Sequence, residues 1–200
     1  LLGAVEWGYE EDGATLLAHL EKIVQYNVQS SEKEKFDGVM LDIEPYISDS
    51  WKENPEEYMD RYISCMKKGY KFAQKNHLRT AICIPRHYDN QGLTSGLEEL
   101  IKETCDEVAV MNYSCGNEIE AIRTEAALSE KYGKEIHCIL EFQEVGKHGL
   151  TENKTYRNKG IDNAKETWEK LQKEYKNINV TRDYHWSRPV REMLEEKNAD

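Results

Sequence analysis

The residues best suited to chemistry are two acids, Asp42 and Glu44, at the end of the apolar run FDGVMLDIEPY, residues 36–46. In an extended strand alternate side chains share a face, which places the two acids on one face, about 6–7 Å apart along the strand. The charge on one carboxylate disfavours ionisation of the other, and partial burial acts in the same direction. One acid of the pair can therefore hold a proton near neutral pH and act as a general acid.

The opposite face of this run is aliphatic, since Val39, Leu41 and Ile43 alternate with the acids. Such a face suits burial under a layer of helices. In a barrel strand the two acids would point inward, and Glu44 would lie nearest the C-terminal mouth, where barrel enzymes hold their active sites. A merely solvated polar strand end is the alternative interpretation.

The elements that must position these acids follow from a repeated pattern of short apolar runs and longer charged amphipathic segments. This pattern predicts parallel βαβ units. The predicted strands are residues 3–7, 36–44, 79–85, 107–114, 135–143 and 178–186. The predicted helices are residues 13–28, 55–76, 95–105, 117–132, 161–176 and 189–198.

Six such units in 200 residues suggest part of a larger barrel. A closed (β/α)8 TIM barrel takes about 250 residues. We therefore expect an α/β fold in which residues 1–200 form a single TIM-barrel domain with about six βα units, strands three to eight, and without the first two. An open doubly wound sheet is the competing architecture, although no Gly-rich phosphate loop follows any strand.

Composition excludes several partners. The net charge of -11 argues against nucleic-acid binding, which requires clustered Lys and Arg. No apolar run approaches the roughly 20 residues of a membrane span, so we expect no membrane insertion. The cysteines show no CxxC or zinc-like spacing and are expected to be buried thiols: Cys65, Cys83, Cys105, Cys115 and Cys138.

The run of residues 36–44 resembles the signature of a known enzyme family. FDGVMLDIE resembles the DGxDxDxE signature of family 18 glycoside hydrolases, the chitinase and endo-β-N-acetylglucosaminidase family, which lies on barrel strand four. Four positions match the signature: Asp37, Gly38, Asp42 and Glu44. Met111-Asn112-Tyr113 resembles the M-x-Y motif of strand six in that family, and Trp186 resembles the Trp at the base of the sugar pocket on strand eight.

The resemblance implies a retaining, substrate-assisted hydrolysis of β-linked N-acetylhexosamine glycans, with an oligosaccharide or polysaccharide as partner. Glu44 would protonate the glycosidic oxygen while the 2-acetamido carbonyl of the substrate attacks the anomeric carbon and forms an oxazolinium intermediate. Asp42 would orient the acetamido group and offset the positive charge, Tyr113 would hydrogen-bond the acetamido oxygen, and Trp186 would stack on the sugar ring. The family uses no metal or cofactor for this step, and it favours a secreted or cell-surface location, although no signal peptide is visible.

One position departs from the family signature, because Met40 stands where the family has its middle Asp. Met cannot share a proton with Asp42, so the resemblance implies a divergent relative with a shifted pH profile. Two other functions stay open. One is a chitinase-like barrel that binds sugars without cleaving them, and the other is a barrel hydrolase of different chemistry. The sequence indicates no oligomeric state.

Further polar residues at strand ends are candidate sugar ligands: Asn112, Glu141, Gln143, Arg86 and His185. By strand alternation Glu141 could face the cavity, or it could form a structural bridge with Arg86 or Arg182. A zinc or manganese site built from His87, His185, Asp42 and Glu44 is a further alternative, but the H-x-H pair usual in barrel metallohydrolases is absent.

Overall fold

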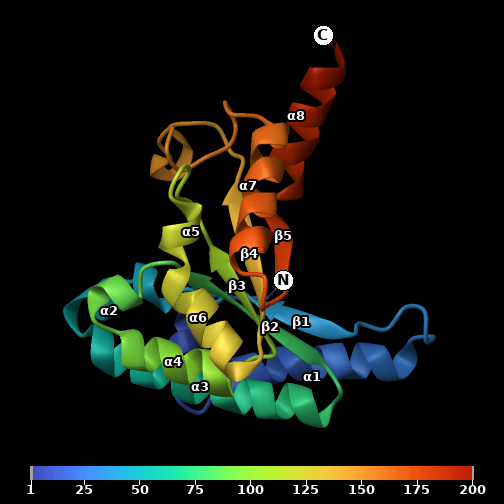
Figure 1. Ribbon diagram of the computed structural model, residues 1–200. Helices are drawn as coiled ribbons and strands as arrows, with labels where there is room; N and C mark the ends of the chain where they lie inside the picture. Colours follow the sequence, from blue (N-terminus) through green and yellow to red (C-terminus); the bar gives the residue numbers. More distant parts are fainter. Residues whose placement is uncertain (1, 200) are drawn as a thin grey trace. The chain divides into compact units, whose positions relative to one another are not determined.

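The strands of the protein form one sheet in the order of the sequence (Figure 1). The computed structural model describes residues 2–199, with side chains described to residue 196. Within that range the strands are β1 (Gly38–Leu41), β2 (Arg79–Pro85), β3 (Glu107–Met111), β4 (Glu135–Glu141) and β5 (Val180–His185). The pairs β1–β2 and β4–β5 are parallel.

The strand order β1-β2-β3-β4-β5 contains no reversal. A doubly wound sheet requires a point at which the order reverses, so this competing architecture is excluded for the described strands. The α/β class predicted from the alternating pattern is confirmed.

Two compact units make up the chain, and each is described by itself. Unit one comprises residues 2–84 and 88–108, and unit two comprises residues 85–87 and 109–199.

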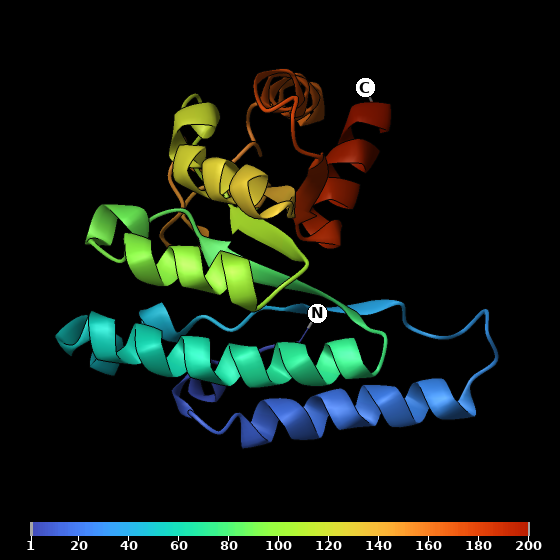
Figure 2. The ribbon, with the colours of Figure 1, turned by 60° about the horizontal axis from the view of Figure 1, so that its bottom comes forward.

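The helices of unit one are α1 (Ala14–Gln29), α2 (Asp49–Glu53), α3 (Pro55–Lys75) and α4 (Thr94–Glu103). Figure 2 shows α1, α3 and α4 side by side as one layer. On α3 the apolar residues recur at helical spacing and are buried, among them Met59, Tyr62 and Met66. Gly69 of α3 allows close contact with α1, because a Cβ at Gly69 would lie 2.5 Å from Leu16 Cδ2.

The predicted strand at residues 3–7 is wrong. Val5–Tyr9 forms the 3-10 turn η1, and only Leu2 bridges to β1, through a hydrogen bond from its N–H to the carbonyl of Met40 at 2.9 Å. The reason is a contact distant in sequence: the backbone at Gly3 lies so close to the segment after β1 that a Cβ there would lie 1.7 Å from the carbonyl oxygen of Asp42. The chain then turns back, so that Gly8 packs against Pro45.

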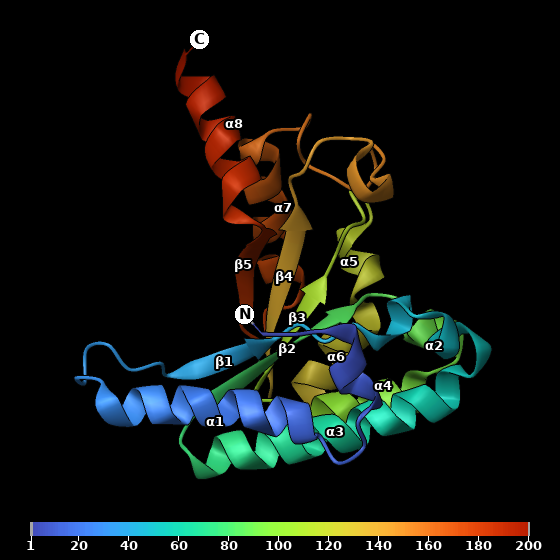
Figure 3. The same cartoon turned by 180° about the vertical axis from the view of Figure 1, so that it is seen from behind.

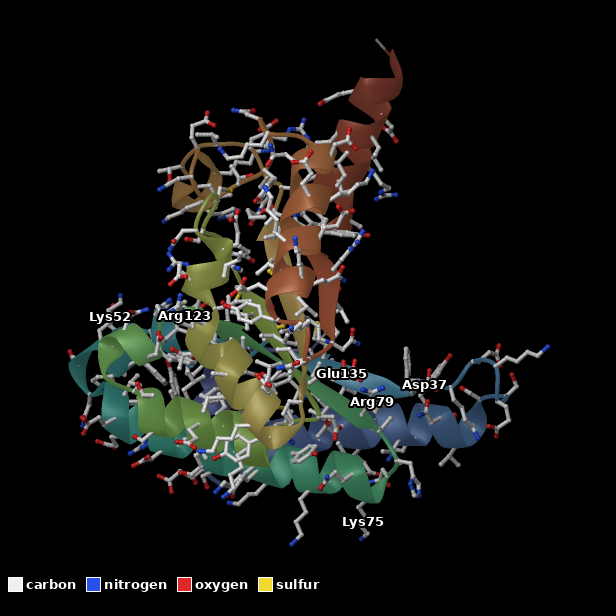
Figure 4. All side chains as sticks on the ribbon, viewed as in Figure 1. Asp37, Lys52, Lys75, Arg79, Arg123 and Glu135 are labelled. Carbon is white, nitrogen blue, oxygen red and sulfur yellow. The ribbon has the colours of Figure 1, made fainter. Side chains whose placement is uncertain are left out.

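Strand β1 is shorter than predicted, but its two faces are as expected. Val39, Leu41 and Ile43 are buried, while Asp42 and Glu44, beyond the last residue of the strand, are half-buried. Asp37 lies at the amino end of β1 beside Arg79 of β2, whose N–H donates to the Asp37 carbonyl at 2.9 Å (Figure 4). The two candidate catalytic acids therefore stand at the opposite, carboxyl end of β1.

The helices of unit two are α5 (Glu118–Ala121), α6 (Arg123–Tyr132), α7 (Ile161–Glu174) and α8 (Ser187–Ala199). Figure 3 shows β4 and β5 side by side, with α7 against β5. The predicted helix 117–132 is divided at Ile122, whose φ of -122° is not helical. Gly133 ends α6 in the left-handed conformation at φ 63°, as glycine does at many helix ends.

The remaining short turns are η2 (Pro45–Ile47), η3 (Asp89–Gln91) and η4 (Lys147–Gly149).

Four cysteines are buried and Cys115 is half-buried, which agrees with the expectation of buried thiols. Burial raises the pKa of Cys65 and of Cys138 to about 12. No helix within the described range combines the length and apolar character needed to cross a membrane.

The loop that follows β4 is fastened to α8 by one arginine. The Arg157 guanidinium donates to the Pro189 carbonyl at 3.3 Å and to Glu196 at 2.7 Å, and it lies 3.9 Å from Glu192. The Arg157 side chain is only 13% exposed, whereas its partners Glu192 and Glu196 are exposed, at 44% and 65%.

Candidate functional site

Glu44 stands at the carboxyl end of β1, in unit one, where the chain turns into η2. The Tyr46 hydroxyl donates a hydrogen bond to Glu44 Oε1. This bond fixes one carboxylate oxygen from a residue only two positions along the chain. The run EPY places this tyrosine two residues after the acid, and a spacing of two in the chain does not by itself indicate a hydrogen bond between them.

A buried phenol lies close to the same carboxylate. Tyr88 is fully buried, and burial raises the pKa of Tyr88 well above its ordinary value, with a further contribution from the negative charge of Glu44. The Tyr88 hydroxyl is therefore neutral at ordinary pH. Its ring lies 5.6 Å from that of Trp51 and 6.0 Å from that of Tyr46, measured between centroids. Glu44 is thus flanked by an aromatic cluster of Tyr46, Trp51 and Tyr88.

The backbone after Glu44 is held in place by residues distant in sequence. The Pro45 carbonyl accepts hydrogen bonds from the Tyr9 hydroxyl at 3.1 Å and the Ser48 hydroxyl at 3.0 Å. Gly8 permits this approach, since its Cβ would lie 3.0 Å from the Cβ of Pro45. The turn η1 therefore helps to position Glu44. A strand at residues 3–7 would not have brought Gly8 and Tyr9 against Pro45 in this way.

Asp42 occupies the same face, two residues earlier. Its N–H donates to the Leu2 carbonyl at 2.7 Å, and its Oδ1 atom is buried. Unit one therefore carries two partly buried carboxylates on the polar face of one chain segment, as strand alternation indicated.

In unit two, Glu141 forms the centre of a polar cluster at the ends of β4 and β5. Glu141 is 2% exposed. Its Oε1 accepts from the N–H groups of Phe142 and Gln143, both at 2.8 Å, and its Oε2 lies 2.9 Å from His185 Nδ1 and 3.2 Å from Gln143 Nε2. Burial opposes ionisation of Glu141, but the hydrogen bonds from His185 and Gln143 outweigh it and lower its pKa.

Among the described residues, Glu141 forms its side-chain bridge with His185 and not with an arginine. Arg182 contacts Glu169 at 3.9 Å and Gln172 at 3.3 Å on α7. Arg86 lies half-buried in the turn after β2. The partner of Glu141 is instead His185, because the parallel register pairs Glu141 directly with His185, whereas Arg182 is paired with Cys138.

Asn112, Tyr113 and Trp186 differ strongly in accessibility. Asn112 is 1% exposed, and its amide donates to the Glu118 carbonyl at 2.9 Å and contacts Cys138 Sγ at 3.5 Å, so it holds the segment after β3. Tyr113 is half-buried, with its ring 6.2 Å from that of His185. Trp186 is 46% exposed.

A small cleft of about 120 Å³ lies beside Trp186. The polar and charged side chains of Gln143, Arg157 and Glu192 are part of its lining. The peptide bond between His185 and Trp186 is cis. Trp186 thus presents an exposed indole next to a polar hollow.

The predicted site residues fall into two groups. Asp42 and Glu44 belong to unit one, whereas the cluster of Glu141, Gln143 and His185 belongs to unit two. Among the described residues, no group of three or more His, Cys, Asp or Glu side chains is arranged to hold a metal ion.

Comparison with known proteins gave no match to a family model, to a curated protein or to a solved structure.

Proposed function

We propose that this chain is a glycoside hydrolase that cleaves β-linked N-acetylhexosamine glycans, with Glu44 as the general acid. In the reaction Glu44 gives its proton to the glycosidic oxygen as the bond to the anomeric carbon breaks. The 2-acetamido oxygen of the substrate forms the new bond to that carbon. Water then attacks the oxazolinium intermediate, and Glu44 takes the proton back.

The observation that carries the proposal is the setting of Glu44. It is half-buried at the carboxyl end of β1, its Oε1 accepts from Tyr46, and the neutral phenol of Tyr88 is nearby. A general acid must be held in one orientation, and the hydrogen bond from Tyr46 fixes the carboxylate of Glu44 in this way. Asp42, on the same face, is assigned to orient the acetamido group and to offset the positive charge of the intermediate.

The proposal includes a finer fold and further roles. The strands in sequential order are taken as consecutive strands of a (β/α)8 barrel. Tyr113 is assigned to hydrogen-bond the acetamido oxygen, and the exposed indole of Trp186 to stack on a sugar ring. Sugar stacking on an exposed aromatic face adjoining polar groups is physically reasonable, since one face of a hexose ring is apolar.

Hydrolysis of two aryl glycosides tests the reaction. The protein should release the aryl alcohol from an aryl N-acetyl-β-glucosaminide and not from the matching aryl β-glucoside, since the assisted step requires the acetamido group. Equal rates on both would refute the assisted mechanism and favour a barrel hydrolase of different chemistry. If neither is cleaved while chitooligosaccharide binds, the non-catalytic sugar-binding alternative is correct.

A conservative variant tests the residue. Glu44→Gln keeps an oxygen that can accept from Tyr46, so the fold should be retained while turnover falls by roughly 10²- to 10⁴-fold. Glu53→Gln, an exposed acid at the end of α2 in the same unit, is the matched control and should turn over like the wild type. Full activity in Glu44→Gln would remove Glu44 from the mechanism.

A further inference from the structure

Unit two contains a polar cavity that none of the residues assigned to sugar hydrolysis lines. It has a volume of about 760 Å³ and lies between α5 and α7, with Tyr156 from the loop before α7 also in its lining. A volume of this size is typical of sites for small ligands.

A chain of hydrogen bonds forms the floor of the cavity. Glu118 is 7% exposed, and its Oε1 accepts from the Gly116 N–H at 2.9 Å and from the Tyr156 hydroxyl. The Tyr156 oxygen is also 2.8 Å from Thr167 Oγ1. Because the single hydroxyl hydrogen of Tyr156 goes to the carboxylate, the Tyr156 oxygen can only accept from Thr167, whose own hydrogen is shared with the Asn163 carbonyl at 3.1 Å.

This arrangement leaves one carboxylate oxygen for a ligand. Both hydrogen bonds that described residues make to the Glu118 carboxylate go to Oε1, while Glu118 is part of the cavity lining. A largely buried carboxylate is costly unless its charge is balanced or well hydrogen-bonded. The floor therefore favours a ligand that brings a positive charge.

The rim carries charges of both signs. Lys159 and Lys170 are exposed, and neither forms an ion pair with a described residue. Of the two glutamates at the rim, Glu120 is paired with Arg123, whereas Glu174 lies one helical turn from Lys170 on α7. Lys159 therefore offers the less compensated positive charge, and an anionic group of a ligand fits there.

The lining also argues against some ligands. Tyr156 is its one aromatic residue, and it is 2% exposed, so no ring face is open for stacking on a sugar or a nucleobase. A ligand with an ammonium group for the floor and a carboxylate for the rim remains the best match.

We propose that this cavity binds a short zwitterionic peptide, with the N-terminal ammonium on Glu118 and the C-terminal carboxylate near Lys159 and Lys170. Capture of an N-terminal amine or a C-terminal carboxylate is a known mode of peptide recognition. The pocket is open to solvent, and its volume of about 760 Å³ has room for a short peptide. The expected occupant is a tripeptide or a dipeptide.

Calorimetric titration of the 200-residue chain with tri-alanine tests the proposal. Tri-alanine should bind saturably, and N-acetyl-tri-alanine, which lacks the ammonium, should bind about 10- to 100-fold more weakly. Tri-alanine amide, which lacks the carboxylate, should also bind more weakly. Absence of tri-alanine binding, or equal binding of the free and acetylated peptides, would overturn the proposal.

Variants locate the two ends of the peptide. Glu118→Gln should weaken tri-alanine binding, and acetylation should then cost little more, because both changes remove the same interaction. Glu166→Gln, an exposed acid of α7 outside the lining, should bind like the wild type. If acetylation weakens binding equally in the wild type and in Glu118→Gln, the ammonium does not lie on Glu118.

The rim is tested at surface positions where unfolding is not expected. Lys159→Ala combined with Lys170→Ala should remove the preference for the free carboxylate over the amide, and exposed Lys173→Ala should keep that preference. This comparison, together with the three peptides on the wild type, decides the proposal even where Glu118→Gln fails to fold. A double lysine variant that still prefers the free carboxylate would overturn the assignment.

Discussion

Replacement of Glu141 by alanine should strongly destabilise unit two. The 2%-exposed carboxylate accepts from two backbone N–H groups and contacts two side chains. Each buried donor left without an acceptor costs about 1–3 kcal/mol. The Phe142 N–H keeps a long bond to the His185 carbonyl at 3.4 Å, so its loss is partial. We therefore expect Glu141→Ala to lower the free energy of unfolding by about 2–4 kcal/mol.

The matched variant Glu141→Gln separates shape from charge. Glutamine retains an oxygen for the N–H groups of Phe142 and Gln143, and it loses the charge toward His185 and the hydrogen bond that the Gln143 amide donates to Oε2. Its expected cost is about 1 kcal/mol, similar to one ordinary hydrogen bond. A larger cost for glutamine than for alanine would contradict the role given to the backbone donors.

Urea unfolding followed by circular dichroism and tryptophan fluorescence measures these differences. For a chain of this length, 2–4 kcal/mol corresponds to a fall in Tm of about 4–16 °C. Glu195→Ala, an exposed acid on α8, serves as the control and should change stability little. A loss below about 1 kcal/mol in Glu141→Ala would refute the reasoning.

The same carboxylate predicts a pH dependence. The pKa of Glu141 is lowered in the folded state, so its contribution is complete above the unfolded value of 4.5 and is lost as pH falls through the folded pKa. Stability measured from pH 7 down to acid should fall more steeply in the wild type than in Glu141→Gln, which cannot titrate. Parallel curves would show that His185 and Gln143 do not stabilise the ionised form.

Three further results are expected. Gly69→Ala should destabilise unit one by about 1–3 kcal/mol in urea unfolding, because the new Cβ would lie 2.5 Å from Leu16 Cδ2. A stability equal to that of the wild type would show that α1 can shift away from α3 at no cost. Cys65 and Cys138 are buried and have pKa values of about 12, so in the native protein at pH 8 they should not react with iodoacetamide. Mass spectrometry measures the labelling, and rapid labelling would contradict their burial. Tyr113→Phe should lower glycoside turnover by less than the general-acid variant, since it removes one hydrogen bond, and an unchanged rate would remove Tyr113 from the proposed site.

Local periodicity predicted most elements because it reflects which face of each element is buried. The alternation of Val39, Leu41 and Ile43 with polar residues predicted both faces of β1, and helical spacing located α3. Periodicity failed where contacts between residues distant in sequence decide the local structure. Gly3 lies against the Asp42 carbonyl, and this contact cannot be read from the run GAVEW.

The site shows the same division. The spacing of two residues predicted the pair of Asp42 and Glu44, whereas the hydrogen bond from Tyr46 to Glu44 depends on the turn after β1. The bond between Glu141 and His185 depends on the register of β4 against β5 across 44 positions. The sequence named both residues as candidates but offered no means to pair them, which is why an arginine bridge was considered.

The attachment of Arg157 to α8 links two segments that are far apart in sequence. Detaching α8 would break its bonds to Pro189 and Glu196 and leave a guanidinium that is now 13% exposed without those partners. Opening of the helix and loosening of the loop should therefore be one cooperative event rather than independent fraying. In native-state hydrogen exchange, amides near Arg157 and those in the first turns of α8 should share one opening free energy, and α8 should act as a reporter of the order of that loop.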